Sequence, residues 1–383
     1  MKIISVVGAR PNFIKIAPFI KAIKSYNKDG KASIEHILVH TGQHYDDRMS
    51  KSFFEALKIP SADINLGIGS GTHAEQVGYT MIAFEKVLIK EQPDWVVVVG
   101  DVNATLACSV TAKKLNVRVC HIEAGLRSGD MQMPEEINRL VTDRLADLLL
   151  VPDRLSAKNL LGEGCTNEQV VMVGNIMIDT FDANLEKALA ISKSDIINRN
   201  VHSETSSKVV LEDHNYAVVT LHRPSNVDDK ETLKGILNFL ANSVAEKMPI
   251  IWPVHPRTEK QLKNFNLWDV LLAIPNIQLV YPLGYHDLLQ LNMNAKVMLT
   301  DSGGLQEECT VLGTKCITMR WNTERPITLK EHGGVSVLVG NDLQLLEKEF
   351  QIFLKEDVKA IRPEMWDGKT ALRCVDAILK YKS

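Results

Sequence analysis

The sequence predicts an α/β protein made of two doubly wound, Rossmann-like parallel sheets. Short β-branched runs alternate with longer helical patterns almost from end to end, which is typical of parallel strands connected by helices. The predicted strands are apolar at successive positions, as expected where both faces of a sheet are covered. The chain has 383 residues, more than one ordinary core accommodates, so two domains are expected.

The expected strands form two series of six. The first series is residues 3–7, 34–39, 95–99, 117–122, 148–151 and 170–173. The second series is residues 216–221, 250–254, 277–281, 297–300, 316–319 and 335–339. Helical patterns occupy residues 14–25, 50–57, 104–115, 135–146, 230–247, 258–264, 285–292 and 305–312.

A polar stretch at about residues 191–213 separates the two series and is expected to link the domains. The expected domains are therefore an N-terminal domain over residues 1–190 and a C-terminal domain over residues 191–369. A last helix, in residues 370–383, is expected to cross back to the first domain. Because such sheets bind ligands at the carboxyl ends of their strands, both domains are expected to face a central cleft.

Composition excludes several classes of function. Hydrophobic residues make up 45% and charged residues 24% of the chain, as in soluble globular proteins. A net charge of −3 gives no broad attraction to nucleic acid or an anionic membrane. No run approaches the roughly 20 apolar residues that span a bilayer, and the N-terminal run lacks a signal-peptide cleavage region. Six scattered cysteines form no C-x-x-C pair, so a cytoplasmic protein is expected.

Three acidic residues are expected at the rim of the first sheet. Asp101 and Glu123 each directly follow a predicted strand, and Glu135 begins a predicted helix. Each alone has an ordinary explanation, since aspartate caps helices and acids in a first turn suit the helix dipole. Three acids delivered to one rim by neighbouring segments instead favour a proton-transfer site.

The first strand ends in Gly8-Ala9, before Arg10 and a helix that contains Lys15. Backbone N–H groups of such a turn can face an anion, and arginine adds a bidentate grip on phosphate. A plain strand–helix turn with a surface arginine explains the segment equally well. The third glycine of G-x-G-x-x-G is missing, so no dinucleotide site is predicted.

Two histidines, His222 and His255, follow equivalent strands in the second half, each close to an arginine. One such histidine often caps a helix, but two at equivalent positions favour an anion-facing role. Metal binding is the other use of histidines with acids. The sequence has none of the standard ligand spacings, so neither a metal nor another cofactor is expected.

The strand at residues 297–300 runs into Ser302, Gly303 and Gly304 and then a helix. Two glycines let a diphosphate approach the N–H groups at a helix N-terminus, and Ser302 adds a hydroxyl. Glu308, about one turn further along, is placed to accept hydrogen bonds from a ribose diol. A flexible turn explains the glycines but not the acid, so the segment favours binding of a nucleotide sugar.

Together these segments resemble the non-hydrolysing UDP-N-acetylglucosamine 2-epimerases, whose fold is similar to that of the two-domain B-type glycosyltransferases. The matching motifs run in order over nearly the whole chain. They are residues 8–15 (GARPNFIK), 41–44 (TGQH), 100–101 (GD), 121–127 (HIEAGLR), 134–139 (PEEINR), 174–175 (GN), 221–223 (LHR), 253–255 (PVH), 300–308 (TDSGGLQEE) and 323–326 (TERP).

The resemblance implies reversible epimerisation at carbon 2 of UDP-N-acetylglucosamine, which gives UDP-N-acetylmannosamine. Carbon 2 has no adjacent carbonyl, so direct deprotonation and return is implausible. The reaction implied by the resemblance eliminates UDP, forms 2-acetamidoglucal and then adds UDP back. The resemblance also implies a homodimer.

The resemblance assigns roles residue by residue. The implied catalytic residues are Asp101, Glu123, Glu135 and His222. The implied groups that bind UDP, or surround the diphosphate and sugar, are Arg10, Lys15, Arg139, His255, Ser302, Gly303, Gly304 and Glu308. Which carboxylate removes the proton and which returns it stays open.

Some members of the family use a second substrate molecule as an activator, held partly by a Gln-His pair that stands here as Gln43-His44. Residues 65–73 (NLGIGSGTH) contain no arginine to complete such a site. We therefore do not expect activation by substrate.

Several alternatives remain. The first alternative is a 2-epimerase of the same family that acts on a related UDP-amino sugar, such as a UDP-2,3-diacetamido uronic acid or a UDP-N-acetylfucosamine precursor. A B-type glycosyltransferase would need an acceptor groove and would not need three acids around one sugar carbon. A hydrolysing relative would release UDP and free N-acetylmannosamine. A module that only binds nucleotide sugars does not account for so many ionisable groups.

Overall fold

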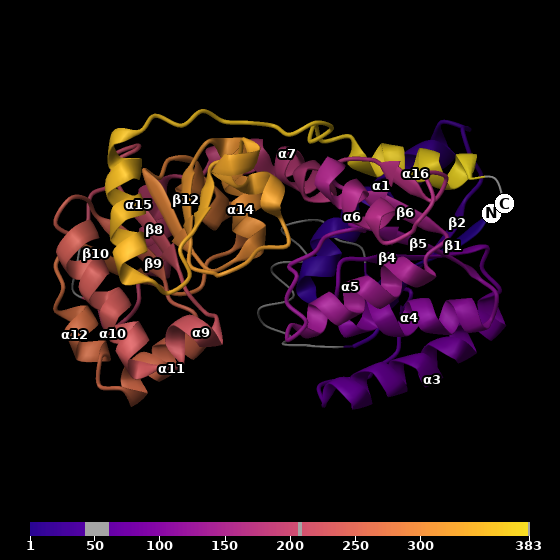
Figure 1. Ribbon diagram of the computed structural model, residues 1–383, viewed down its shortest axis with the longest axis horizontal. Helices are drawn as coiled ribbons and strands as arrows, with labels where there is room; N and C mark the ends of the chain where they lie inside the picture. Colours follow the sequence, from indigo (N-terminus) through magenta and orange to yellow (C-terminus); the bar gives the residue numbers. More distant parts are fainter. Residues whose placement is uncertain (43–60, 206–208, 382–383) are drawn as a thin grey trace. The chain divides into compact units, whose positions relative to one another are not determined.

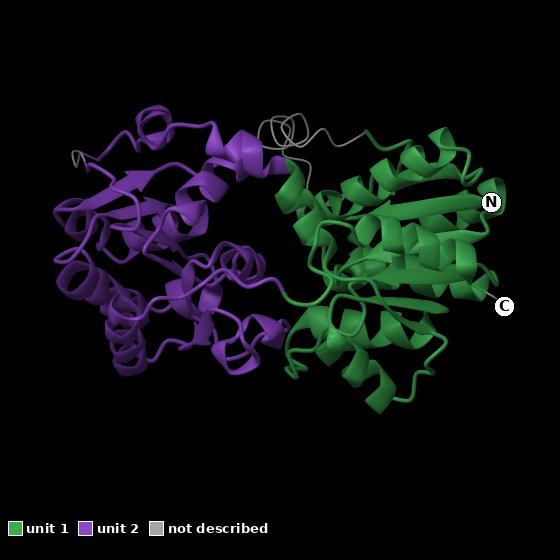
Figure 2. Ribbon diagram, turned by 90° about the horizontal axis from the view of Figure 1, so that it is seen from above, with its two compact units in different colours: residues 1–183, 363–383 green, residues 184–362 purple. Residues whose placement is uncertain are grey.

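The computed structural model describes residues 1–42, 61–205 and 209–381. It splits into two compact units (Figure 2). Unit 1 consists of residues 1–183 and 363–383, and unit 2 of residues 184–362. Each unit contains a parallel sheet, which confirms the predicted fold class. The helix predicted at residues 50–57 and the Gln43-His44 pair lie outside the described residues.

In the described part of unit 1 the sheet has seven strands in the order β3-β2-β1-β4-β5-β6-β7. They are β1 (Lys2–Val7), β2 (Glu35–His40), β3 (Ile64–Asn65), β4 (Trp95–Val99), β5 (Arg118–Ile122), β6 (Leu148–Val151) and β7 (Val170–Met172). Every residue of β4 and β6 is buried, as the apolar runs predict. The strand order reverses beside β1, so the ends of β1 and β4 form a topological switch point.

Helices cover both faces of this sheet (Figure 1). They are α1 (Arg10–Lys28), α3 (His73–Glu91), α4 (Asn103–Lys114), α5 (Pro134–Leu145), α6 (Arg154–Gly162) and α16 (Thr370–Lys380). Helix α7 (Ile176–Leu189) begins in unit 1 and ends in unit 2, whose first residue is Asn184. The sequence patterns did not predict α3, although its start has a capping box. There Thr72 accepts a hydrogen bond from the Glu75 N–H, and the Glu75 carboxylate accepts one from the Thr72 N–H.

The sheet of unit 2 has six strands within the described ranges, in the order β10-β9-β8-β11-β12-β13. They are β8 (Ala217–Thr220), β9 (Ile250–Pro253), β10 (Ile277–Val280), β11 (Val297–Thr300), β12 (Lys315–Thr318) and β13 (Ser336–Leu338). Its helices are α8 (Lys193–Asn200), α9 (Pro224–Val227), α10 (Lys230–Phe239), α11 (Pro256–Asn264), α12 (Trp268–Leu272), α13 (Tyr285–Met293), α14 (Gly303–Leu312) and α15 (Leu343–Lys355).

Alternate residues of the strands in unit 2 enter two separate cores. Trp252 of β9 packs in one core with Phe239 and Phe350, while Ile251 belongs to the other core with Cys309. The single α-helix predicted at residues 230–247 is wrong in its second half. After α10 the chain forms a π-helical turn at Leu240–Val244, which keeps both end residues buried.

The chain returns to unit 1 through residues 363–383, where α16 packs on α1. Trp366 donates a hydrogen bond to the carbonyl of Pro152 at 3.1 Å. Asp179 of α7 accepts hydrogen bonds from the first backbone N–H groups of α16, Thr370 at 3.1 Å and Ala371 at 2.8 Å. Among the described residues no helix has the length and apolar character of a membrane span.

Replacing Asp179 by alanine should loosen the start of α16, because two helix N–H groups lose their acceptor in a buried place. We expect Asp179→Ala to lower the free energy of unfolding by about 1–2 kcal/mol in urea titrations. Asp195→Ala, at an exposed first-turn aspartate of α8, is the control and should change it by less than about 0.5 kcal/mol. Equal effects of the two variants would contradict this role.

Candidate functional site

The first cluster of the candidate site lies where β4 and β5 of unit 1 end. Lys15 of α1 forms a buried ion pair with Glu123, the first residue after β5. Glu123 has a φ of 70°, a left-handed conformation that is uncommon for glutamate. Only one of its carboxylate oxygens is paired; Oε1 is buried with no hydrogen-bond partner among the described residues. A buried acceptor of this kind is costly unless something binds to it.

Asp101 lies beside this pair, two residues after β4. Its carboxylate accepts a hydrogen bond from Arg139 of α5 at 2.5 Å, and its carbonyl accepts one from Asn138 at 2.9 Å. Arg139 is almost fully buried and also binds Glu136. Although burial opposes ionisation, hydrogen bonds from Ser128 and Arg139 lower the pKa of Glu136. The Asp101 side chain remains 27% exposed, so it is accessible to a ligand.

The structure does not bring Glu135 into this cluster. Glu135 is exposed in the first turn of α5, and its neighbour Glu136 is the acid that points inward. Arg10 begins α1, and its side chain is not among those described. The N–H groups of Gly8 and Ala9 donate to Asn12 within the turn, as in a plain strand–helix turn, and an anion-facing role of this segment stays a prediction.

In unit 2, His222 follows β8 and is backed by Asp301. Its Nδ1 lies 2.8 Å from Asp301 Oδ1, while the other carboxylate oxygen accepts from the backbone N–H groups of His222 and Arg223. Burial opposes ionisation of Asp301, but the bond with His222 lowers its pKa. Since the carboxylate holds a proton on Nδ1, Nε2 of a neutral His222 is an acceptor. The ring is 41% exposed.

His255 follows β9, and its ring centroid lies 5.4 Å from that of His222. Its Nδ1 accepts a hydrogen bond from the N–H of Arg257 at 3.1 Å and so caps α11. Burial and the neighbouring His222 lower the pKa of His255. His255 is therefore a neutral ring with its proton on Nε2, a donor beside the acceptor of His222.

The two glycines after Ser302 have different neighbours. A Cβ on Gly303 would lie 2.8 Å from Glu324 and about as close to Arg320 and Arg325, so this position has no room for a side chain. A Cβ on Gly304 would meet nothing within 4 Å. Gly303 thus leaves room for a buried ion cluster beside the N-terminus of α14, and Gly304 leaves the backbone N–H groups of that N-terminus open to a ligand.

The ion cluster beside Gly303 joins two arginines to two acids. Glu324 accepts from Arg320 at 2.8 Å and pairs with Arg325, which also lies 2.8 Å from Glu307. Burial opposes ionisation of Glu324, but Arg325 and Arg320 hold its pKa well below the usual range. Nη1 of Arg320 is buried without a hydrogen-bond partner in the described part of the chain.

Glu308 lies on the next turn of α14 and is buried. Burial, with a contribution from the charge of Glu307, raises the pKa of Glu308 to about 8, against a hydrogen bond from Tyr285. At neutral pH the free protein therefore holds Glu308 mainly as the uncharged acid. A ligand that donates hydrogen bonds to it would favour the ionised form.

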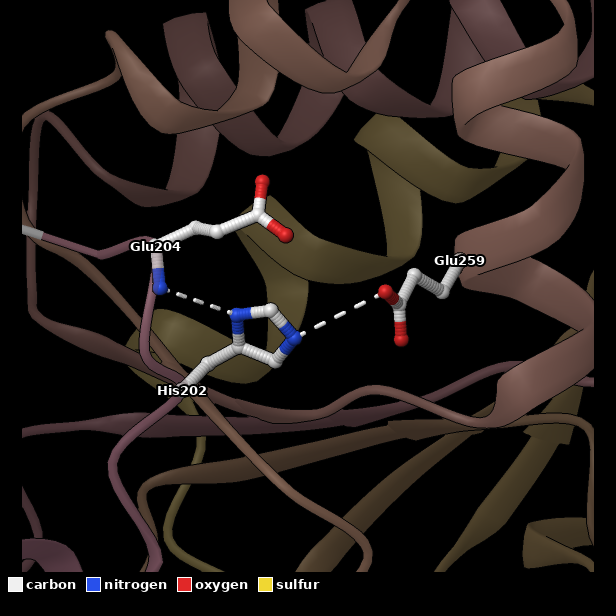
Figure 3. A group of neighbouring side chains, drawn as sticks. All are labelled: His202, Glu204 and Glu259. Carbon is white, nitrogen blue, oxygen red and sulfur yellow. Dashed lines mark hydrogen bonds and ion pairs between the residues drawn. The ribbon is translucent and has the colours of Figure 1, made fainter.

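One group of side chains among the described residues offers atoms suited to a metal. His202 lies near Glu204 and Glu259 (Figure 3), with ligand atoms within 4.8 Å of one another. However, Lys263 lies 2.9 Å from the Glu204 carboxylate and 2.8 Å from that of Glu259. Its ammonium group already balances these carboxylates, and we propose no metal there.

Sequence reasoning named the strand-end residues but missed most of their partners. Asp101, Glu123, Lys15 and Arg139 do come together in unit 1, and Ser302, Gly303, Gly304 and Glu308 share one helix start in unit 2. The missed residues contact the backbone or the charged side chains of these clusters. They are Asn12, His121, Glu136, Asp143, Asp301, Glu307, Arg320, Glu324 and Arg325. The motif TERP at residues 323–326 was the sequence signal that could have identified Glu324 and Arg325.

Two doubly wound units, one with acids at its strand ends and one with a glycine turn before a helix, define an α/β enzyme fold of the glycosyltransferase-B type. A family model described as UDP-N-acetylglucosamine 2-epimerase matches residues 27–379. The chain belongs to this family, whose members are isomerases.

Similar proteins cover the whole chain. The chain is 43% identical over 383 residues to the UDP-N-acetylglucosamine 2-epimerase of Methanocaldococcus jannaschii, covering 100% of this chain and 99% of that protein. It is 38% identical over 384 residues to the UDP-2,3-diacetamido-2,3-dideoxy-D-glucuronate 2-epimerase of Pseudomonas aeruginosa, covering 99% and 100%. The crystal structure of the M. jannaschii enzyme in complex with UDP-GlcNAc and UDP matches with a TM-score of 0.84 at 41% identity, covering 100% of both chains.

The raised pKa of Glu308 makes stability depend on pH. The folded protein keeps this proton up to about pH 8, whereas the unfolded chain releases it near the ordinary value of 4.5. We therefore expect this group to lower the free energy of unfolding by roughly 1 kcal/mol per pH unit between these values. Urea titrations at pH 6 and 8 should show a smaller fall for Glu308→Gln than for the wild type. The exposed control Glu246→Gln should keep the wild-type fall, and an unchanged fall in Glu308→Gln would contradict the assignment.

Proposed function

We propose that this enzyme interconverts UDP-N-acetylglucosamine and UDP-N-acetylmannosamine by eliminating UDP and adding it back. The observation that carries the proposal is the pair of carboxylates at adjacent strand ends of unit 1. Glu123 is buried with one oxygen unpaired, and Asp101 is accessible and held by Arg139. Two acids in unlike environments suit the two proton transfers: one removes the proton from one face of carbon 2 and keeps it, and the other, which has taken a proton from solvent, delivers that proton to the opposite face.

Lys15 and Arg139 set the chemistry of these acids in the proposal. Lys15 pairs with Glu123 and Arg139 with Asp101, so each cation holds its acid in place at the strand end and would compensate its negative charge once the acid has given up a proton. Glu135 is the third proposed acid of the reaction. Glu135 is exposed in the free enzyme, so a catalytic role requires that substrate binding bring its carboxylate to the sugar.

Unit 2 is proposed to hold UDP. The open backbone at Gly304 and the N-terminus of α14 suit a diphosphate, with Ser302 beside them. Glu308 suits the ribose diol. His222, in its doubly protonated form beside the Asp301 carboxylate, would give its Nε2 proton to the departing diphosphate and take it back on re-addition, and the Nε2 N–H of His255 would donate a hydrogen bond to the same group. Arg10 is proposed as a further phosphate ligand.

The main alternative is the related uronic acid. The P. aeruginosa relative is named for UDP-2,3-diacetamido-2,3-dideoxy-D-glucuronate and is 38% identical to this chain. That sugar carries a carboxylate at carbon 6 and an acetamido group at carbon 3, so it needs a cation and added space that UDP-N-acetylglucosamine does not need. Side-by-side turnover of the two sugars separates these substrates.

The proposed reaction is tested by incubating the enzyme with UDP-N-acetylglucosamine in deuterated water and following carbon 2 by NMR. We expect deuterium at carbon 2 in a mixed gluco and manno nucleotide pool. Free N-acetylmannosamine would instead indicate a hydrolysing enzyme. Absence of exchange with this sugar, but exchange with the diacetamido uronic acid, would assign the alternative substrate.

Matched amide variants test the carboxylates. Asp101→Asn, Glu123→Gln and Glu135→Gln should each lower turnover at least about 100-fold while UDP affinity, measured by calorimetry, changes little. The exposed Glu168→Gln is the control and should retain full turnover. Normal turnover in any of the three would remove that residue from the mechanism.

We further propose a cytoplasmic homodimer. All six cysteines are free thiols, which suits a reducing compartment. On α3, Tyr79, Ile82 and Ile89 are exposed by 58, 58 and 62%. Their spacing places them on one face of the helix, and an apolar face of this kind is suited to pairing with a second copy.

Ile82→Glu should convert the dimer to monomer in light scattering coupled to gel filtration, because it places a charge on this apolar face. Val270→Glu is the control, since Val270 is a comparably exposed apolar residue in unit 2. A wild-type protein that elutes as a monomer would contradict the dimer. A dimer that survives Ile82→Glu would place the interface elsewhere.

A further inference from the structure

His121 is a buried titratable residue that the proposed mechanism does not use. It lies in β5, two residues before Glu123, and its side chain is inaccessible to solvent. Its Nε2 is 2.8 Å from the carbonyl oxygen of Gly100, and its Nδ1 is 2.6 Å from Oδ1 of Asp143 in α5. Both ring nitrogens therefore face oxygen atoms.

The two oxygens orient the ring. A backbone carbonyl only accepts hydrogen bonds, so Nε2 donates its proton to the Gly100 carbonyl. Nδ1 faces Asp143, whose Oδ2 accepts from the Gly125 N–H at 3.0 Å and from Arg127 at 2.7 Å. Burial opposes ionisation of Asp143, but His121 and Arg127 lower its pKa. The ring is thus fixed between a carbonyl on one side and a carboxylate on the other.

We infer that His121 is a positioning residue: its ring bridges Asp143 and the Gly100 carbonyl, and so holds the Gly100 peptide and the direction of Asp101. The inference on turnover rests on the proposed function. Asp143 is held in place in turn by Arg127, which also pairs with Glu163 at 2.6 Å.

The backbone geometry shows why Gly100 needs this support. Gly100 has a φ of 69°, and its N–H donates to the carbonyl of Ile122 at 3.2 Å. His121 binds its carbonyl, so β5 holds Gly100 at both its N–H and its C=O. A glycine peptide rotates easily, and its rotation would swing Asp101. The same ring connects this peptide to α5, the helix that supplies Arg139 to Asp101.

The hydrogen bond to Gly100 is tested by NMR on the intact enzyme labelled with nitrogen-15 in histidine. We expect one imidazole whose Nε2 N–H exchanges slowly with water, because this ring is buried and hydrogen-bonded. The signal is assigned by its loss in His121→Asn. Absence of a slowly exchanging Nε2 N–H that His121→Asn removes would overturn the inference. This measurement requires no substrate, so it stands apart from the proposed reaction.

The positioning role is tested by two variants that each keep half of the ring's contacts. The amide of His121→Asn reaches toward Asp143 but not Gly100, whereas that of His121→Gln reaches toward Gly100. We expect His121→Asn to lower kcat about 10- to 100-fold with UDP affinity unchanged, and His121→Gln to recover part of the loss. Equal turnover in His121→Asn and the wild type would overturn the role, as would equal losses of turnover and UDP affinity.

A separate control covers the case where a variant unfolds. Thermal midpoints are measured first, and turnover is compared at a temperature where every variant is folded. If both variants are unfolded at every temperature, the role on Asp101 is overturned in favour of a purely structural one. If the wild type shows no exchange at carbon 2, the proposed function fails while the NMR result on His121 stands.

Discussion

Burial of charge at the ends of apolar strands is the constraint on which both units depend. A parallel sheet brings the carboxyl ends of its strands to one edge, and the strands here are buried on both faces. Any acid or base placed there sits next to the core, where an unpaired charge is costly. The structure meets this cost with local partners: Lys15 for Glu123, Arg139 for Asp101, and His222 for Asp301.

The two units meet the constraint in different ways. In unit 1 the acids Glu123 and Asp101 are each paired with a cation. In unit 2, Glu308 pairs with no cation among the described residues and is kept uncharged by burial and by its neighbour Glu307, whose own charge is taken up by Arg325. A proton-transfer site must tolerate negative charge on its acids, whereas a ribose site needs an acceptor only when the ligand arrives. The difference in partners therefore matches the proposed division of tasks.

The sequence predicted the parts of this arrangement that depend on local pattern. Apolar runs placed the strands, and each strand end then placed Asp101, Glu123, His222 and Ser302 at the correct edge. Position within a turn or helix was harder to predict. The sequence could not show that Gly303 has no room for a side chain while Gly304 does, because the ion cluster that surrounds Gly303 comes from residues 320–325. Glu135 and Glu136 are adjacent in α5, and only the packing of Arg139 shows which one points inward.

The partners were unpredictable because their contacts join segments far apart in the chain. Asp143 meets His121 across 22 residues, and Lys15 meets Glu123 across 108. No periodicity encodes such a pair. The sequence does show that partners are needed: His121 lies within the run Val119 to Ile122, which is otherwise apolar, and its buried ring nitrogens require hydrogen-bond partners. His121 could have been predicted on this ground to contact neighbouring segments, because a polar ring at a buried strand position is costly unless its nitrogens are hydrogen-bonded.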